Sequence, residues 1–142
     1  MTKEKSEMGR KSRGKGMRFE LKVRHKLESD GWTVCKWTNI IKDGKIVAAP
    51  RKYNPFTKQA SSGNGFPDFV CFREKISRIL KDGIVEKVIR EGKIVIGVES
   101  KSNKYLDAAE KVLCEEYKKL GTFDEIEVAY KNKKGKIDYY KV

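Results

Sequence analysis

The spacing of apolar residues predicts two helices in this chain. Over residues 16–29 apolar side chains recur every four positions, which is a helical period, and Gly31 follows as the residue that ends the helix. Over residues 105–120 a second apolar stripe precedes Gly121, which is again suited to end a helix. The stripe of this second helix consists of Leu106, Ala109, Val112, Leu113, Tyr117 and Leu120.

Shorter apolar runs predict the strands. They cover residues 32–41, 46–48, 66–72, 94–98, 125–130 and 137–140. Asp43-Gly44 and Lys133-Lys134-Gly135 have the composition of turns, so each predicts a hairpin between the runs that flank it. The run at 94–98 is apolar on both faces, as in a central strand that is covered from both sides. Helix, strands, helix and strands around one mixed sheet is an α/β fold.

Three segments carry weaker patterns. Residues 49–65 contain several Pro, Gly and Ser residues and are predicted to be a loop. The apolar residues of 74–92 suit a helix, whereas Asp82-Gly83 between apolar runs suits a hairpin, and both alternatives stay open. Residues 1–14 are polar and basic, so we expect a flexible N-terminal arm, with or without a role, before a single domain over 15–142.

Composition adds a strong positive charge to this pattern. Lys and Arg number 33 against 20 Asp and Glu, which gives a net charge of +13, and the isoelectric point is about 9.6. Such a balance favours a polyanionic partner, and a nucleic-acid backbone is the leading candidate. A solvated, lysine-rich surface is the alternative, since the single glutamine and the heavy use of Lys and Glu are typical of heat-adapted proteins.

Cysteine, histidine and hydropathy exclude several classes of protein. The three cysteines are widely spaced, without the spacing of a zinc site or a disulfide framework, and we expect Cys35 and Cys71 to be buried thiols. One histidine, His25, is too few for a histidine-based catalytic site. The sequence has no run near the roughly 20 apolar residues of a membrane span and no secretory signal, so we expect a cytoplasmic protein without a membrane partner.

Two carboxylates stand where charge is costly to bury. Asp68 lies in the apolar run that follows Pro67, and Glu99 ends the run at 94–98. If their strands are neighbours, the two charges repel each other unless they share a cation. Mg²⁺ takes oxygen ligands and is usually completed by water and substrate phosphate, so the pair predicts a Mg²⁺ site, with Mn²⁺ as a substitute.

Three further residues fit this chemistry. Lys101 shares a face with Glu99 because strand side chains alternate, so its ammonium group can orient a water or stabilise charge on a phosphate. The same alternation turns Ser100 to the other face, although its backbone carbonyl can be a metal ligand. Glu20 projects between the apolar rows of the first helix and can supply a third carboxylate. Taken singly, each motif also suits a structural ion pair.

Basic residues that can contact phosphate lie in two segments. The first segment supplies Arg10, Lys11, Arg13 and Lys15, and the segment 49–65 supplies Arg51, Lys52 and Lys58. Tyr53 and Phe56 add rings that can stack on bases.

These motifs together resemble the PD-(D/E)XK nuclease superfamily. Pro67-Asp68 matches its first motif and Glu99-Ser100-Lys101 its second. The likeness extends over about residues 10–142 and is greatest to archaeal Holliday junction resolvases and related viral or replication-repair nucleases. The further similar segments are Arg10-Lys11-Ser12, Gly31-Trp32-Thr33-Val34 and Ser61-Ser62-Gly63.

The resemblance implies a restriction-endonuclease-like αβββαβ core, with a central mixed sheet flanked by helices. It also implies that Glu20, Asp68 and Glu99 are metal ligands and that Lys101 is the catalytic lysine. Ser12 and Ser62 fall in the shared segments and would join the basic residues in contacting DNA. Some relatives carry a glutamine on the helix after the lysine; residues 105–120 have none, and Glu110 does not simply replace it.

We therefore expect a Mg²⁺-dependent DNA endonuclease that hydrolyses phosphodiester bonds and selects DNA structure as a Holliday junction resolvase does. A related nuclease with a preference for duplex, nicked or single-stranded DNA is the close alternative. A non-catalytic nucleic-acid-binding module of the same fold and a structural or partner-binding protein are the others. A homodimer would suit a symmetric junction, and Tyr139 and Tyr140 are candidates for its interface or for the core.

Overall fold

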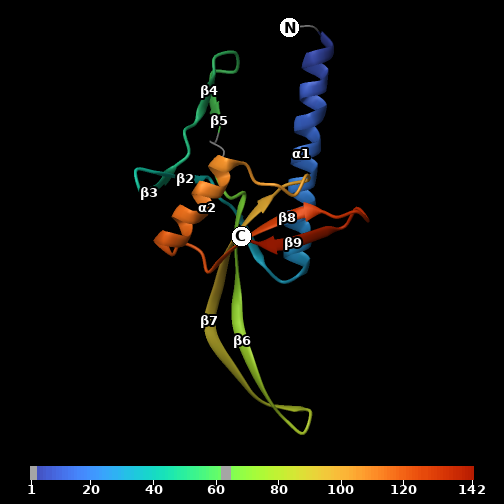
Figure 1. The fold of residues 1–142 in the computed structure, drawn as a ribbon, viewed down its shortest axis with the longest axis vertical. Coiled ribbons are helices and arrows are strands. Elements are labelled where there is room, and N and C mark those ends of the chain that lie inside the picture. The colour runs from blue at the N-terminus through green and yellow to red at the C-terminus, as the bar shows by residue number, and fades with distance from the viewer. Residues whose placement is uncertain (1–2, 62–64) are drawn as a thin grey trace.

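The structure, a computed structural model, is an α/β fold built on a five-stranded mixed sheet (Figure 1). It describes residues 3–61 and 65–142. The strand order of the sheet is β1-β6-β7-β8-β9, in which β7 and β8 are parallel and the other neighbours antiparallel. The elements are α1 (Lys3–Ser29), β1 (Thr33–Lys36), β2 (Asn39–Lys42), β3 (Lys45–Ala48), β4 (Lys52–Asn54), β5 (Gln59–Ser61), β6 (Phe69–Lys81), β7 (Ile84–Ser100), α2 (Ala108–Leu120), β8 (Glu125–Lys131) and β9 (Ile137–Lys141).

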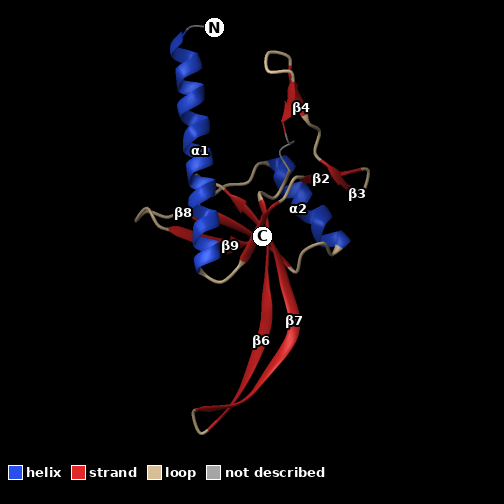
Figure 2. Ribbon diagram, turned by 180° about the vertical axis from the view of Figure 1, so that it is seen from behind, coloured by secondary structure: helices blue, strands red, loops and turns tan. Residues whose placement is uncertain are grey.

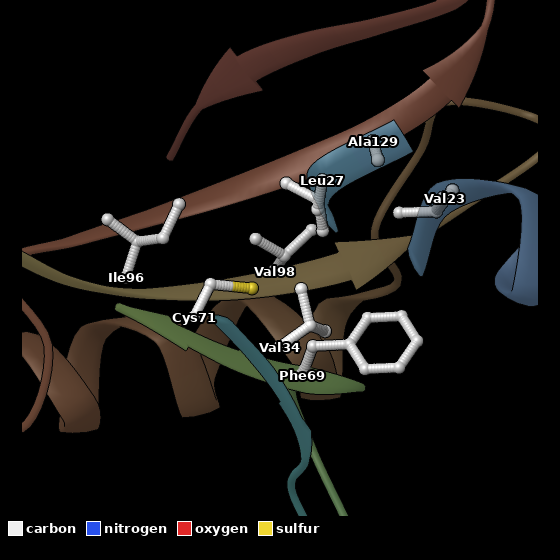
Figure 3. Packing of buried hydrophobic residues seen from close by; sticks show 8 residues of the cluster. All are labelled: Val23, Leu27, Val34, Phe69, Cys71, Ile96, Val98 and Ala129. Carbon is white, nitrogen blue, oxygen red and sulfur yellow. The ribbon is translucent and has the colours of Figure 1, made fainter. Parts of the chain in front are cut away.

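Helix α1 covers one face of the sheet. Its buried residues Val23 and Leu27 lie four positions apart and reach the strands β7 and β8 at Val98 and Ala129 (Figure 3). The whole buried cluster on this face consists of Val23, Leu27, Val34, Phe69, Cys71, Ile96, Val98 and Ala129. Every second residue of β7 faces α1, so the strand residues between them face the other side of the sheet.

Helix α2 covers that opposite face. Cys114 and Tyr117 are fully buried and pack with Phe123 and Val128, as part of a second cluster that also holds Phe66, Leu106 and Ile126. The predicted stripe is correct in its centre, but Val112 and Leu120 are about half exposed. The ends of α2 are well specified: Asp107 forms a capping box with Glu110, and Gly121 takes the left-handed conformation expected of it.

Helix α1 begins much earlier than its apolar period predicts. Residues 3–14, expected to be a flexible arm, form its first turns, and Met8 there is 66% exposed. Lys, Glu, Arg and Met have high helix propensity and this stretch holds no proline, so the helix continues without a core to cover. The start near residue 16 is therefore wrong, whereas the flexibility of this segment stays a prediction.

The strands differ from the prediction in two places. The run at 32–41 is divided between β1 and β2, because the chain turns at Trp37, whose indole packs against Tyr117 and Phe123. The segment 49–65, expected to be a loop, contains the short hairpin β4–β5. The turn at Asp43-Gly44 and the terminal hairpin β8–β9 are confirmed.

Residues 74–92 form a long hairpin rather than a helix. Asp82-Gly83 is its turn, with both residues in the left-handed region, and β6 and β7 pair on either side of it. The hairpin extends well away from the sheet, in the direction opposite to the N-terminal half of α1 (Figures 1 and 2).

Several smaller expectations are also decided. Burial raises the pKa of the Cys71 thiol to about 12, as expected of an inert core cysteine, whereas Cys35 is exposed and that expectation is wrong. Tyr139 and Tyr140 pack against the two core clusters. No helix in the described ranges is long and apolar enough to cross a membrane.

Two glycines allow the chain to approach itself closely beside Asp68. A Cβ atom on Gly97 would lie 2.9 Å from Cγ of Pro67 and 3.2 Å from the ring of Phe123. A Cβ atom on Gly65 would lie 2.5 Å from the backbone oxygen of Trp37. Only glycine fits at these positions, and both close approaches fix the segment that carries Asp68.

We predict that Gly97→Ala lowers the free energy of unfolding by about 1–3 kcal/mol, because the added methyl group forces Pro67 away from β7. Gly16→Ala is the matched control. Gly16 lies in α1 with nothing within 4 Å of a Cβ, so this change should stabilise the protein by about 0.5–1 kcal/mol. Urea denaturation measures both, and equal effects of the two substitutions would contradict the close contact.

Candidate metal and phosphate site

The predicted motif residues meet at the edge of the sheet where β6 begins and β7 ends. These strands are antiparallel with Phe69 opposite Val98, so Asp68, just before β6, comes opposite Glu99 and next to Ser100. Oδ2 of Asp68 accepts hydrogen bonds from the backbone nitrogen of Ser100, at 2.9 Å, and from its hydroxyl group. The hydroxyl of Ser100 therefore turns to the site and not away from it, which corrects the simple alternation argument.

The backbone of Asp68 is fixed from the other side by the turn after β1. Its carbonyl oxygen accepts a hydrogen bond of 2.9 Å from the backbone nitrogen of Trp37. The indole nitrogen of Trp37 in turn donates to the hydroxyl of Tyr117 on α2, at 3.1 Å. Asp68 is thus connected to both β7 and α2.

Glu99 is the one charged residue in the buried set of described residues, with 5% of its surface exposed. The pKa of its carboxyl group is raised from 4.5 to about 11, first by burial, then by the charge of Asp68 and a hydrogen bond with it, and then by Glu110. At neutral pH and without a cation, Glu99 therefore holds a proton. A divalent cation shared with Asp68 would take the place of that proton.

Lys101 and Glu110 form an ion pair near the buried Glu99 carboxyl group. Nζ of Lys101 lies 2.7 Å from Oε2 of Glu110, and both side chains are mostly buried. Burial by itself lowers the pKa of Lys101, but Glu110, Glu99 and Asp107 outweigh it, and the net shift is upward. Lys101 is therefore a fixed cation near Glu99, on the face that the strand alternation predicts.

The position of Glu110 comes from the start of α2. Its Oε1 accepts a hydrogen bond of 3.0 Å from the backbone nitrogen of Asp107, while its own backbone nitrogen donates to Asp107. One carboxylate thus serves both the capping box and Lys101. Glu110 was not among the residues predicted for the site, although Asp107-x-x-Glu110 is a recognisable capping signal.

Glu20 is not brought into this cluster. Its carboxylate on α1 pairs with the ammonium group of Lys36 on β1. Glu20 and Asp68 do line one pocket of about 790 Å³, together with residues of α1 and β1. In the described ranges, no group of three His, Cys, Asp or Glu side chains is arranged to hold a metal ion. The carboxylates that the structure brings together are Asp68, Glu99 and Glu110.

A basic groove runs between α1 and the β8–β9 hairpin. It has a volume of about 850 Å³, and Ser102, the residue after Lys101, forms part of its wall. Six cationic side chains line it, which are Lys15, Arg18, Lys22, Lys26, Lys131 and Lys136. Of these only Lys15 is among the predicted phosphate-binding residues, because the others come together only when α1 lies across the sheet.

The other predicted phosphate-binding residues lie farther from the site. Arg10 and Lys11 line a shallow pocket along α1, and Arg51 and Lys58 are exposed around the β4–β5 hairpin. The backbones of Ser12, Arg13 and Lys52 belong to α1 and β4, but their side chains lie outside the described set, as does the whole of Ser62.

Comparison with known proteins adds no relative. No family model matches the chain, and neither a curated protein nor a solved structure does.

We predict that Glu99→Gln changes the pH dependence of stability in the absence of divalent cations. Between pH 4.5 and 11 folded Glu99 keeps a proton that the unfolded chain loses, so the free energy of unfolding of the unmodified protein falls as pH rises. Glutamine cannot ionise and removes this loss, so the difference between variant and protein should grow by up to about 1.4 kcal/mol per pH unit.

Urea denaturation at pH 5 and pH 8, with EDTA present, measures this difference. Glu115→Gln is the control, because Glu115 is exposed on α2. A constant difference between the Glu99 variant and the unmodified protein at both pH values would show that Glu99 is ionised in the folded state.

Proposed function

We propose that the protein is a Mg²⁺-dependent endonuclease that hydrolyses phosphodiester bonds in DNA. The observation that carries the proposal is the buried Glu99 carboxyl, which adjoins Asp68 and has the fixed cation Lys101 beside it. Two adjacent carboxyl groups raise each other's energy without a cation, and a cationic side chain next to them suits an anionic substrate.

The donor set fits a hard divalent cation. Asp68 and Glu99 would hold Mg²⁺ through carboxylate oxygens, with the backbone carbonyl of Ser100 as a further oxygen ligand. When bound, such an ion polarises a phosphodiester oxygen and lowers the pKa of a coordinated water. The hydrogen bonds from Ser100 fix the orientation of the Asp68 carboxylate.

Lys101 acts as a donor and not as a base. Its raised pKa keeps the ammonium group charged at neutral pH, so it can donate a hydrogen bond to the attacking water or to a phosphate oxygen. Glu110 holds Nζ of Lys101 in place through the 2.7 Å contact and the start of α2. Glu110 is thus a positioning residue.

The order of elements supports the same proposal. With the two small hairpins β2–β3 and β4–β5 and the terminal strand β9 set aside, the chain runs α1-β1-β6-β7-α2-β8, and this agrees with the αβββαβ order expected from the resemblance. DNA would follow the basic groove from Ser102 along α1, where six cationic side chains can contact its phosphates. Junction selectivity and action on branched or duplex DNA are further parts of this proposal.

A non-catalytic nucleic-acid-binding module is the second candidate. The groove supports binding and cleavage equally, and the ion pair of Glu20 with Lys36 leaves the third predicted carboxylate engaged elsewhere. Cleavage assays separate the two functions.

We predict that Asp68→Asn and Lys101→Met each reduce cleavage by about a hundredfold or more while DNA binding persists. The amide of asparagine still accepts the hydrogen bonds from Ser100 but loses the negative charge, and methionine keeps the length of Lys101 without its cation. Labelled four-way junction, duplex and single-stranded DNA, each with Mg²⁺ or EDTA, are the substrates.

The controls are Asp43→Asn, in the β2–β3 turn, and Lys118→Met, near the end of α2. Both should cleave as the unmodified protein does. Cleavage in EDTA or full activity of Asp68→Asn would refute the mechanism, and binding without cleavage of any substrate would favour the second candidate.

We also predict that Lys22→Gln/Lys131→Gln weakens DNA binding and lowers its dependence on salt. Each lost phosphate contact reduces the slope of log affinity against log salt concentration by about 1, so the double variant should lose about 2. Lys118→Gln/Lys119→Gln removes the same charge at the far end of α2 and is the control. Equal slopes for the two double variants would place the DNA elsewhere.

A further inference from the structure

Among the residues that the structure describes, the outer part of the β6–β7 hairpin pairs with no strand other than its own two. β1 pairs with β6 no farther than Phe72, and β8 pairs with β7 only from Ile96 onward. Residues 74–91 therefore form a two-stranded ribbon outside the sheet (Figures 1 and 2). This ribbon is called the arm from here on and is distinct from the N-terminal arm expected over residues 1–14. A two-stranded hairpin alone in water is marginally stable, so a ribbon of this length gains from a cover.

Both faces of the arm carry aliphatic side chains. Residues opposite each other in an antiparallel pair share a face, and the pairs Ile76 with Arg90, Arg78 with Val88 and Leu80 with Val85 define the first. The second face is defined by the pairs Ser77 with Ile89, Ile79 with Lys87 and Lys81 with Ile84. Six of the aliphatic residues are between 44% and 72% exposed, namely Ile76, Ile79, Leu80, Ile84, Val85 and Val88.

This exposed surface is large enough to matter for association. The six half-exposed aliphatic side chains present apolar surface on the order of 400 Å² in all, with four of them on the first face and two on the second. A standard protein interface buries roughly 800 Å² on each partner, and a little over half of that is apolar. The two faces together thus expose apolar area of the order that one side of such an interface needs, and the first face carries the larger share.

The charge of the arm argues against nucleic acid as its partner. Residues 74–91 contain five Lys or Arg and four Asp or Glu, a net charge of +1, in a chain of +13. Two of its cations face acidic residues across the ribbon: Arg90 lies 3.8 Å from Glu74, and Lys75 lies 4.0 Å from Glu91. The arm is therefore a nearly neutral part of a very basic protein.

The direction of the arm also separates it from the candidate site. β6 starts beside Asp68 and runs away from it, so the turn at Asp82-Gly83 lies at the opposite end, roughly 40 Å along the strand. A partner bound to the arm leaves Asp68, Glu99 and the basic groove open.

The free edge of β7 matches a second copy of itself. An antiparallel pairing of two β7 edges about Val88 sets Glu86 of each copy opposite Arg90 of the other, and the two-fold symmetry makes this contact twice. Edges of this kind, with unpaired backbone groups and aliphatic side chains, are templates for association.

We propose that the arm is the interface through which two copies of this chain form a dimer, which leaves the two candidate sites at opposite ends of the assembly. This inference does not depend on the proposed nuclease activity. It moves the dimer interface away from Tyr139 and Tyr140, which pack against the core.

The test is the solution mass of the full chain by sedimentation equilibrium over a range of concentrations. The arm variant Leu80→Thr/Ile84→Thr removes aliphatic surface but keeps strand propensity. Ile46→Thr/Val47→Thr makes a similar change on the exposed β2–β3 hairpin and is the control. We expect the unmodified chain and the control to be dimers, and the dissociation constant of the arm variant to rise by about tenfold or more.

Amide hydrogen exchange provides a second measurement that does not depend on a substitution. Exchange in residues 74–91 should slow as the concentration of the unmodified chain rises, while exchange in β2–β3 stays constant. A monomer at all concentrations, or a dimer of equal strength in the arm variant, would overturn the proposal. A monomeric chain whose arm variant loses DNA affinity would assign the arm to nucleic acid instead.

Discussion

The burial of the Glu99 carboxyl group in the central sheet is the constraint on which the surrounding structure depends. β7 is covered on the Glu99 face by α2, so this carboxyl has little access to water. Burial of a lone carboxylate in such a place costs free energy. Here polar side chains, rather than solvent, surround the carboxyl group. Asp68, Lys101 and Glu110 come from three different segments of the chain, and each is fixed by its own local device.

The contacts that fix these residues involve the backbone more than the side chains of the site. Gly97 lets Pro67 approach β7, the turn at Trp37 holds the carbonyl of Asp68, and the capping box starts α2 at the height where Glu110 reaches Lys101. The two faces of the sheet have different contents as a result. The α2 face carries the buried Glu99 carboxyl group, whereas the side of α1 carries the basic groove.

Much of this arrangement can be predicted from the sequence, because it follows from the spacing of apolar residues and from the residue types that form turns. The apolar runs, Asp43-Gly44 and Gly121 indicate the α/β order, and Pro67-Asp68 with Glu99-x-Lys101 indicates where charge enters a strand. Residues that depend on long-range placement are not legible in this way. Glu20 meets Lys36 only because α1 crosses the end of β1, and the start of α1 depends on propensity without burial. The role of Glu110 was not predicted, because a glutamate at this position of a helix can be a capping residue, an ion-pair partner or both, and the sequence does not distinguish these roles.

The long pairing of β6 and β7, which continues past two irregularities of register, has a consequence for how this protein can vary. Because strand side chains alternate with a period of two, adding or deleting residues in matched pairs near Asp82-Gly83 lengthens or shortens the ribbon without rotating any residue between Phe69 and Phe72. The distal end of the ribbon can thus accept insertions while the proximal end, which carries the carboxyl groups, keeps its register. Related chains can therefore differ widely in the reach of this hairpin and still present the same chemistry at the opposite edge of the sheet.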